Sequence, residues 1–386
     1  MHVITRCIAG AGGVAVRGAV GLDPTRYESI LVTGTREGTL LDRARAHGVE
    51  VVVLPDLVAP ISPRHDAQAL SRLTALMRER RVQVVHTHSS KAGVLGRLAA
   101  HHAGVELIVH TLHGFPFHDF QNPAVHATYV GIERRLSRIT DAYLAVGTGV
   151  AVEALRRGLA RPEQVYTVGP QVDFSDVART PESRAAARAV LGLAQDAPVV
   201  GTVGRLDFQK APEIMLGALR RMEVPAVLVW AGDGDLAERT ARQVRELGLD
   251  GRVRLLGNRA DVAALLPAFD VFAMASRYEG LPCAIVEAQQ CGVPVVATAV
   301  NAVPDVVIPG ETGLLVPPGR ADLLAGALDF TLRHPVTAER WAVRARQHLG
   351  DRYDVETGAG ILDDIYSSAP ARAHRELAGA GPGRHR

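Results

Sequence analysis

Short apolar runs alternate along this chain with longer segments in which apolar residues recur every three or four positions. The runs have the length of buried strands, whereas the longer segments have the period of amphipathic helices. Strands that alternate with helices pair in parallel, so the pattern predicts an α/β fold with crossover helices. The first series has predicted strands at 3–8, 29–33, 50–54, 82–86, 106–110 and 142–146, and predicted helices at 66–80, 92–103 and 123–139.

The alternation stops at 165–180 and then begins again. This break indicates a connection between two doubly wound, Rossmann-like domains that face each other across a cleft. In such sheets, ligands bind outside the carboxyl ends of the strands. The second series has predicted strands at 198–203, 225–230, 252–256, 270–274 and 293–298, and predicted helices at 212–220, 235–247, 282–291, 320–333 and 337–349.

The length of the chain, 386 residues, also favours two domains over a single core. We expect an N-terminal domain at 1–168 and a C-terminal domain at 169–352. A last helix at 353–368 can cross back to the N-terminal domain. The remaining residues, 369–386, are rich in Ala, Gly, Pro and Arg and are expected to be disordered.

A glycine-rich segment follows the first predicted strand and leaves little room before the second. We expect a loop and then a short helix, which Gly18 and Gly21 weaken further. In that loop, Gly12 and Gly13 can offer backbone amides to a phosphate. The stretch GAGGVA at 10–15 also fits a loose Gly-x-Gly-x-x-Ala dinucleotide fingerprint.

Charge and cysteine content exclude several classes of protein. The chain has 43 basic and 41 acidic residues, whereas a dedicated nucleic-acid-binding domain normally has a strongly basic face. The three cysteines lack metal-ligand spacing and fit a reducing compartment. No apolar run approaches the roughly 20 residues that span a bilayer, and glycines dilute the apolar stretch after Arg6 that could resemble a signal peptide. We therefore expect a cytoplasmic protein that binds no nucleic acid.

Only two of the basic residues are lysines, Lys91 and Lys210. A compact ammonium group fits as a point charge against a phosphate or sugar oxygen, which a planar guanidinium does less well. Both lysines are therefore candidates for substrate binding. Chance survival in an arginine-rich sequence is the alternative.

The segment SRYEGLPCAIVEAQQCGVPVVAT at 276–298 predicts a loop, a helix and a strand. Pro282 suits the first position of the helix, and Gly292 suits its C-terminal cap. Unpaired amides and the helix dipole favour an anion at such a helix start. The amides concerned are those around Gly280 and Leu281.

Two glutamates accompany this predicted anion site, Glu279 at its edge and Glu287 further along the helix. A carboxylate can accept two hydrogen bonds at once and so suits the vicinal hydroxyls of a sugar. A nucleotide sugar has an anionic diphosphate with a hydroxylated ring at each end, so this class of ligand fits the segment. Two unrelated surface glutamates are the alternative.

The segment GTVGRLDFQKAPE at 201–213 places further charges at the carboxyl end of a predicted strand. Arg205 and Lys210 follow Gly204 in the loop before the next helix. A guanidinium fork and an ammonium group together neutralise a diphosphate and stabilise it as a leaving group. A solvated loop with ordinary charges is the alternative.

The combination GRL-x-x-QKAPE and SRYEG-x-P-x-x-x-x-EA-x-x-x-G-x-PVVAT resembles the retaining glycosyltransferases of family 4, which have the GT-B fold. Further matches are VVHTHSSKAGVLGRLAA at 84–100, HTLHGFPFH at 110–118 and VWAGDGDL at 229–236. One departure is TAVNAVPDVV at 298–307, where the family tends to have a pair of glycines. The resemblance implies an acceptor-side first domain and a nucleotide-sugar-binding second domain.

The resemblance also implies roles for the candidate residues. Arg205 and Lys210 would hold the donor diphosphate, Glu287 the ribose hydroxyls and Glu279 the hydroxyls of the transferred sugar, and His113 would reach that sugar near the reacting carbon. The other donor-side candidates are Gly12, Gly13, Gly232, Asn258 (whose backbone would read the base), Gly280 and Leu281, and the acceptor-side candidates are Lys91, His113, Phe115 and His118.

The reaction implied is transfer of a sugar from a nucleotide-sugar donor, with UDP as the expected nucleotide, to an acceptor hydroxyl. The acceptor attacks from the side that the nucleotide leaves, and the departing phosphate oxygen takes the proton. Neither a metal nor a cofactor is expected. The rival predictions are a GT-B nucleotide-sugar epimerase or hydrolase, a nicotinamide dehydrogenase, and a sugar-nucleotide-binding module without catalysis.

The sequence leaves the acceptor and the oligomeric state open. A lipid-linked or polysaccharide intermediate and a small natural product are the candidate acceptors, and the first would bring the protein to the inner face of the membrane. The predicted helix 123–139 allows either a membrane-surface face or a core-facing side with solvated charges. Its apolar side has Tyr129, Ile132, Leu136 and Ile139, and its basic residues are Arg134, Arg135 and Arg138.

Overall fold

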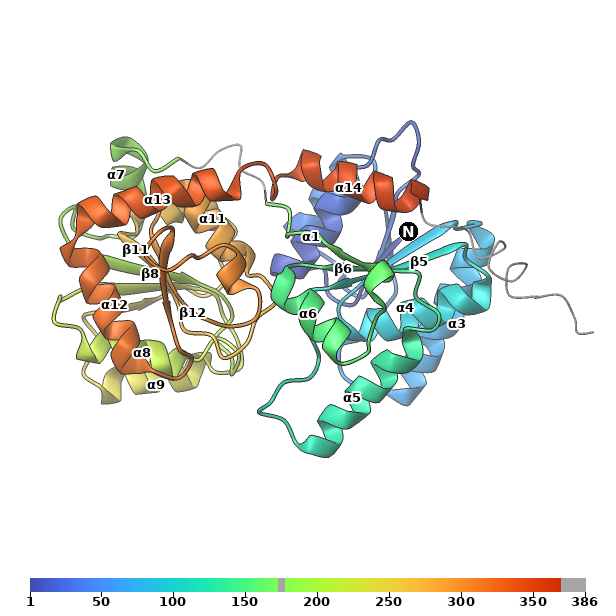
Figure 1. The fold of residues 1–386 in the computed structure, drawn as a ribbon, viewed down its shortest axis with the longest axis horizontal. Coiled ribbons are helices and arrows are strands. Elements are labelled where there is room, and N and C mark those ends of the chain that lie inside the picture. Colours follow the sequence, from blue (N-terminus) through green and yellow to red (C-terminus); the bar gives the residue numbers. More distant parts are fainter. Residues whose placement is uncertain (173–177, 369–386) are drawn as a thin grey trace, which may run out of the picture. The chain divides into compact units, whose positions relative to one another are not determined.

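The computed structural model describes residues 1–172 and 178–368 of the chain. Within these residues the chain forms two compact units (Figure 1). Unit 1 consists of Met1–Gln171 and the segment from Val355 on, and unit 2 consists of Val172–Asp354. Each unit is a parallel sheet with helices on its faces, so the prediction of two doubly wound, Rossmann-like sheets is confirmed.

Unit 1 is built on a parallel sheet of seven strands. These strands are β1 (His2–Ile4), β2 (Ile30–Thr33), β3 (Glu50–Val53), β4 (Val84–His88), β5 (Leu107–Leu112), β6 (Ala142–Ala145) and β7 (Val165–Thr167). Their order across the sheet is β3-β2-β1-β4-β5-β6-β7. The direction of winding therefore reverses between β1 and β4, which is where a doubly wound sheet opens a crevice at its carboxyl edge.

The helices of unit 1 bury both faces of this sheet. One face packs under Leu73 and Ala99, which come from two helices, and the other under Val16 and Leu41, which come from two further helices. Burial on both faces is the reason that these strands are nearly continuous apolar runs. In chain order the helices are α1 (Ala9–Val20), α2 (Thr39–Ala46), α3 (Pro63–Glu79), α4 (Ser90–Ala103), α5 (Pro123–Leu136), α6 (Thr148–Arg156), the 3-10 turn η1 (Pro162–Gln164) and α14 (Val355–Ser368).

Unit 2 repeats the plan with six strands. They are β8 (Val199–Val203), β9 (Val227–Ala231), β10 (Val253–Leu255), β11 (Val271–Met274), β12 (Val295–Thr298) and β13 (Gly313–Val316). Their order is β10-β9-β8-β11-β12-β13, so the winding reverses between β8 and β11. On one face, Leu216 and Leu328 pack against Trp230 and Ala273 of the sheet.

The helices of unit 2 lie before, between and after these strands (Figure 1). The predicted helices 212–220, 282–291 and 320–333 agree with the structure to within one residue at each end. The helices and 3-10 turns of unit 2 are α7 (Pro181–Val190), α8 (Pro212–Arg221), α9 (Ala237–Glu246), α10 (Val262–Leu265), η2 (Leu266–Ala268), α11 (Cys283–Cys291), η3 (Val303–Asp305), α12 (Ala321–Arg333) and α13 (Pro335–Leu349).

The last described helix, α14, belongs to unit 1 although the chain reaches it from unit 2. It lies beside α1 (Figure 1), and its Leu362 and Ile365 are buried with Leu144 of β6. Tyr27 donates a hydrogen bond of 2.5 Å to Asp363, which ties the outer side of the helix to the loop after α1. No helix among the described residues is long and apolar enough to cross a membrane. The predicted tail at 369–386 lies outside the described residues.

The first helix corrects the prediction of a glycine loop followed by a short helix. Helix α1 begins at Ala9 and has 12 residues, so Gly12 and Gly13 lie inside it. The amide of Gly12 donates to the carbonyl of Ile8, at 3.4 Å, and this amide is therefore used within the helix. A Cβ atom at Gly12 would stand 2.8 Å from the carbonyl carbon of Cys7, so glycine allows a close approach of helix and loop.

Burial explains why this glycine-rich segment is helical. Ala15, Val16 and Ala19 are completely or almost completely buried against Ile4 and Leu31 of the sheet. Each interior glycine costs a helix about 1 kcal/mol relative to alanine. Burial of the apolar side outweighs that cost, so tertiary packing decides the local structure.

Two glycines allow a test of the packing in unit 2. A Cβ atom at Gly201 in β8 would lie 2.0 Å from a ring carbon of Phe269, whereas one at Gly326 in α12 meets no atom within 4 Å. We predict that Gly201→Ala lowers the free energy of unfolding by at least about 1–3 kcal/mol through overpacking. Gly326→Ala should raise it by up to about 1 kcal/mol. Urea unfolding measures both, and equal stabilities would contradict this packing.

Candidate functional site

The predicted donor residues gather at the carboxyl edge of the sheet in unit 2. The loop after β8 contains Arg205 and Lys210, and the loop after β11 contains Glu279. Because β8 and β11 are neighbours in the sheet, the two loops meet at the point where the winding reverses. In open α/β sheets this is the place where ligands bind.

A buried ion pair joins the two loops. The ammonium group of Lys210 donates to Oε1 of Glu279, and the two side chains are 14% and 5% exposed. Ser276 donates to the same oxygen at 2.7 Å, and Gln209 donates to Oε2 at 3.0 Å. Buried charges are tolerated when they are paired and hydrogen bonded in this way.

The backbone of the two loops is also connected. The amide of Arg277 donates to the carbonyl of Gln209 at 2.8 Å. The guanidinium group of Arg277 lies 4.1 Å from the ring centre of Phe208 and pairs with Glu213 of α8. These contacts hold the loop after β11 against the loop after β8, so the ion pair of Lys210 has a rigid frame.

Two residues on this frame have left-handed backbone conformations. Ala211, with φ 50°, follows Lys210 and is completely buried at the start of α8. Asn301, with φ 45°, accepts a hydrogen bond of 2.8 Å from the amide of Glu279. Asn tolerates the left-handed region better than most residues. Asn301 therefore supplies both the turn and a side-chain acceptor in a segment where the family tends to have glycines.

Glycines bring the loops after β8 and β9 into backbone contact. A Cβ atom at Gly232 would stand 2.0 Å from the carbonyl oxygen of Gly204, and both glycines have a positive φ. Trp230 donates to the same carbonyl at 2.8 Å. Because glycines have no side chain, only backbone atoms of Gly204 and Gly232 lie next to Arg205 at this point. The exposed Asn258 follows β10, the next strand across the sheet.

The guanidinium group of Arg205 is half exposed and connects to the ion pair through a single residue. It pairs with Asp207 at 2.8 Å and lies 3.4 Å from Oε1 of Gln209, which in turn donates to Glu279. Gln209 was not among the predicted site residues, although it lies between Arg205 and Lys210 in the same motif. The structure thus brings three of the predicted residues into one hydrogen-bonded group.

Helix α11 begins beside this group. Cys283 is its first residue, and Pro282 therefore occupies the cap, one position earlier than predicted. Gly292, with φ 87°, ends the helix as predicted. Gly280 and Leu281 are buried in the turn before the helix, and Glu287 is half-buried on it. The first turn of a helix has unpaired amides, so this start can receive an anion.

The absence of a metal from the donor site remains a prediction. The loop after β9 contains an Asp-x-Asp sequence, Asp233 to Asp235. The carboxylate of Asp233 accepts a hydrogen bond of 2.8 Å from the amide of Gly234. Among the described residues, however, no group of three potential metal ligands gathers there. The loops after β8 and β11 contribute three positively charged side chains at this edge, Arg205, Lys210 and Arg277.

The acceptor-side candidates lie in unit 1 and contact different partners. Lys91 pairs with Asp66 at 2.5 Å, so this lysine has a structural partner. Phe115 stacks on Phe117, with the ring centres 4.8 Å apart. His118 is partly buried before α5, and burial lowers the pKa of its imidazole.

Helix α5 fits the core-facing alternative. Leu136 is buried, Tyr129 and Ile132 are partly buried, and Arg134 and Arg135 are exposed. The helix thus packs its apolar side on unit 1 and solvates its basic side.

His113 follows β5 and is joined to two histidines that were not among the predicted site residues. Its Nε2 atom lies 3.1 Å from Nδ1 of His88, and Nε2 of His88 lies 3.1 Å from Nδ1 of His2. Burial lowers the pKa of His113 to about 4, so its ring is neutral at neutral pH. The signal in the sequence was the alternation His86-Thr87-His88, which puts two histidines on one face of a strand.

Comparison with protein families divides the chain in the same way as the fold. Residues 8–176 match the family described as Glycosyltransferase Family 4, and residues 183–348 match Glycosyl transferases group 1. The chain is similar to the UDP-Gal:alpha-D-GlcNAc-diphosphoundecaprenol alpha-1,3-galactosyltransferase of Escherichia coli, at 32% identity over 66% of this chain and 67% of that protein. It is also similar to the D-inositol 3-phosphate glycosyltransferase of Saccharomonospora viridis, at 33% identity over 75% and 70% of the two chains.

Solved structures have the same fold. The HepE protein of Anabaena in complex with UDP and glucose has a TM-score of 0.83 at 23% identity, over 95% of this chain and 98% of that one. The sucrose-phosphate synthase of Thermosynechococcus elongatus has a TM-score of 0.80 at 22% identity, over 98% and 99%. At these identities the likeness establishes the fold alone.

The buried histidines of unit 1 predict a fall in stability on acidification. The unfolded chain binds protons near the ordinary histidine pKa of 6.5, whereas the folded chain does so at lower pH, down to about 4 for His113. Stability should therefore fall as the pH drops from 7.5 to 5.5, by up to about 1.4 kcal/mol per pH unit for each such ring. Burial is the largest cause of the lowered pKa in each of the five rings, which are His2, His86, His88, His110 and His113.

Urea unfolding at the two pH values, followed by circular dichroism, measures this change. A free energy of unfolding that is constant between pH 7.5 and 5.5 would contradict the prediction.

Proposed function

Since the chain belongs to the family 4 glycosyltransferases, with the GT-B fold, we propose that it transfers a sugar from a UDP-sugar to an acceptor hydroxyl with retention of configuration. Membership of the family makes the protein a sugar-transferring enzyme. The nucleotide, the stereochemistry, the residue roles and the acceptor are the proposed part. One observation carries the proposal, namely the buried pair of Lys210 and Glu279 at the carboxyl ends of β8 and β11.

The charges of this group support a diphosphate site. Arg205 presents a half-exposed guanidinium group, Lys210 is mostly buried against Glu279, and the start of α11 adds unpaired amides. Together they favour the negative charge that develops on the leaving nucleoside diphosphate. In this assignment positively charged side chains take the part that a divalent cation has in other transferases.

The hydrogen bonds of Glu279 support contact with the transferred sugar. A carboxylate has about four lone-pair sites, and three donors already approach this one. Its Oε2 atom accepts from Gln209 and retains a lone pair for a sugar hydroxyl. Because the other donors hold the carboxylate in place, it can orient the sugar without rearrangement. Glu287 on α11 is assigned to the ribose hydroxyls.

The proposed chemistry needs no protein nucleophile. The bond between the anomeric carbon and the diphosphate oxygen breaks while the acceptor oxygen approaches from the same side, and the departing phosphate oxygen takes the acceptor proton. His113 is assigned a contact with the transferred sugar. Its neutral ring can donate or accept one hydrogen bond there but supplies no charge.

We propose a lipid-linked saccharide as the acceptor. The Escherichia coli relative is named for an acceptor attached to diphosphoundecaprenol, and this relative is similar over two-thirds of its length. The Saccharomonospora relative is named for a small inositol phosphate instead. An assay with both acceptor types and several UDP-sugars, with the products identified by mass spectrometry and the anomeric configuration by NMR, tests the assignment.

The two lysines of the chain provide a matched test of the donor site. We predict that Lys210→Met and Glu287→Ala each weaken the binding of UDP at least about tenfold, because the first removes a charge from the diphosphate site and the second removes ribose contacts. Lys91→Met is the control, since Lys91 pairs with Asp66 in unit 1. Isothermal titration calorimetry gives the three dissociation constants.

Wild-type affinity for UDP in both the Lys210→Met and the Glu287→Ala variant would overturn the donor site. Circular dichroism of each variant must first show native secondary structure, because Lys210→Met leaves Glu279 buried without its ionic partner. If Lys210→Met does not fold, the double variant Lys210→Met/Glu279→Gln removes both charges of the buried pair, and its affinity for UDP should also fall at least about tenfold.

A further inference from the structure

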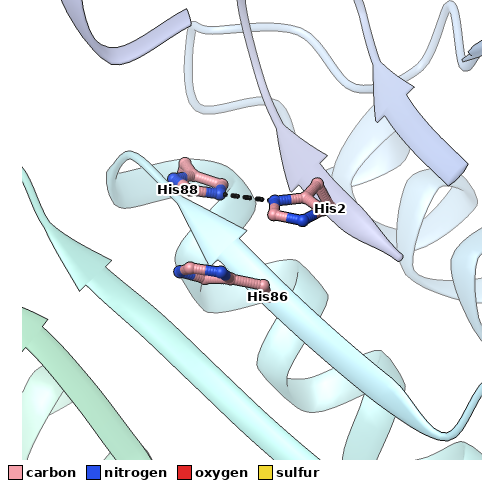
Figure 2. A group of neighbouring side chains, drawn as sticks. All are labelled: His2, His86 and His88. Atoms are coloured by element: carbon pink, nitrogen blue, oxygen red, sulfur yellow. Dashed lines mark hydrogen bonds between the residues drawn. The ribbon is translucent and has the colours of Figure 1, made fainter. Parts of the chain in front are cut away.

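Three histidines lie together on one face of the sheet in unit 1 (Figure 2). His2 in β1 pairs with His86 in β4, and His88 follows two residues later on the same face. Their exposed fractions are 2%, 2% and 1%. Imidazole rings that are buried so completely need hydrogen-bond partners, and they find these partly in one another.

Two of these rings form a hydrogen-bonded chain with His113. Nδ1 of His2 lies 3.1 Å from Nε2 of His88, and Nδ1 of His88 lies 3.1 Å from Nε2 of His113. The chain therefore runs from β1 through the end of β4 to the loop after β5. It uses both nitrogens of His88 and leaves Nδ1 as the second nitrogen of His113.

His86 is outside this chain although it is in the same stack. Its Nδ1 atom lies 2.6 Å from the hydroxyl of Tyr366 in α14, and its Nε2 atom lies 2.6 Å from the hydroxyl of Thr111 in β5. Its ring stacks on that of His88, with the centres 4.3 Å apart. It is therefore a matched control for His88, equal in burial but different in partners.

The three clustered rings lie in a geometry that favours a hydrogen-bonded chain over a metal centre. One nitrogen from each of His2, His86 and His88 lies within 4.8 Å of the others. A tetrahedral zinc site needs in-plane lone pairs that converge on one point about 2.0–2.1 Å away. Here Nδ1 of His2 and Nε2 of His88 point at each other in a hydrogen bond (Figure 2), and the ring of His86 lies over that of His88 with the planes 28° apart, so the nitrogens do not converge on one point.

The tautomers of neutral rings in such a chain are coupled, because each hydrogen bond needs one N–H and one bare nitrogen. Burial, followed by the neighbouring rings, lowers the pKa of His88 well below its ordinary value, so this ring is neutral, and a neutral imidazole has one N–H and one bare nitrogen. If His2 donates from Nδ1, His88 must donate from Nδ1, and His113 then carries its proton on Nδ1. In the opposite arrangement all three rings carry the proton on Nε2.

We propose that His2 and His88 are positioning residues that fix the tautomer of His113, so that Nδ1 of His113 is offered to the sugar in a single hydrogen-bonding state. The inference rests on the proposed function, in which His113 contacts the transferred sugar. A contact of fixed polarity discriminates against the wrong orientation of a hydroxyl, and it needs no reorganisation during transfer. The orienting partner of a histidine commonly has this function in catalytic sites.

The test is ¹⁵N NMR of the full chain with labelled histidines, in which the His113 signals are assigned from their loss in His113→Ala. We expect a single His113 tautomer in the wild type. His88→Phe keeps an aromatic ring but breaks the chain, so His113 should become a mixture of tautomers. His86→Phe, the matched control, should leave the His113 signals unchanged.

His2→Phe is the second variant and does not depend on the folding of His88→Phe. Without His2, the Nε2 atom of His88 has lost its partner, and a buried N–H without an acceptor is unfavourable. The proton of His88 should then stay on Nδ1 and be donated to His113. His113 should consequently carry its own proton on Nδ1, because in this inference His2 selects between the two arrangements and His88 transmits the choice. A mixture of His113 tautomers in His2→Phe would overturn the inference.

Kinetics give the second measurement. In His88→Phe, kcat should fall about tenfold while the dissociation constant of UDP is unchanged, and both should stay at wild-type values in His86→Phe. Failure of the wild type to transfer any sugar would refute the proposed function and leave the NMR measurement intact. Mixed tautomers in the wild type, or His113 signals unaffected by His88→Phe, would overturn the inference. So would stoichiometric zinc whose removal shifts the signals of His2, His86 and His88.

Discussion

A single buried ion pair, between Lys210 and Glu279, organises the candidate donor site. It connects two loops that are 69 residues apart in the chain and adjacent in the sheet, because β8 and β11 are neighbours where the winding reverses. A buried pair is stable only with further hydrogen bonds, and Ser276 and Gln209 supply them. The requirement to satisfy two buried charges thus places an ammonium group, a carboxylate and an amide side chain at one edge of the sheet.

Much of the fold could be predicted because strands buried on both faces appear as uninterrupted apolar runs. The predicted strand 198–203 corresponds to β8 to within one residue. Strand β7 was missed because it is short and lies at the edge of the sheet. Its Tyr166 is exposed, so the sequence shows no apolar run there. Helix α1 was predicted as a loop followed by a short helix because glycine propensity is a local property, whereas the burial of Val16 against the sheet depends on the folded chain.

The site was predictable in its chemistry and less so in its contacts. Charged residues at the carboxyl ends of predicted strands identified Arg205, Lys210 and Glu279, but no sequence pattern shows that the last two bind each other. The role of Asn301 depends on a left-handed backbone conformation, which only the folded chain reveals. The partners of His113 were missed because His2 comes from a strand far away in the sequence, and only the order of β1 and β4 in the sheet makes it a neighbour.

The most direct measurement of the central claim is a crystal structure of the full chain with UDP. We predict that the diphosphate lies at the carboxyl ends of β8 and β11, within hydrogen-bond distance of the ammonium group of Lys210 and the guanidinium group of Arg205, with the ribose against Glu287. A uridine diphosphate bound anywhere else on the protein, with Lys210 and Glu279 unchanged and out of reach, would contradict it.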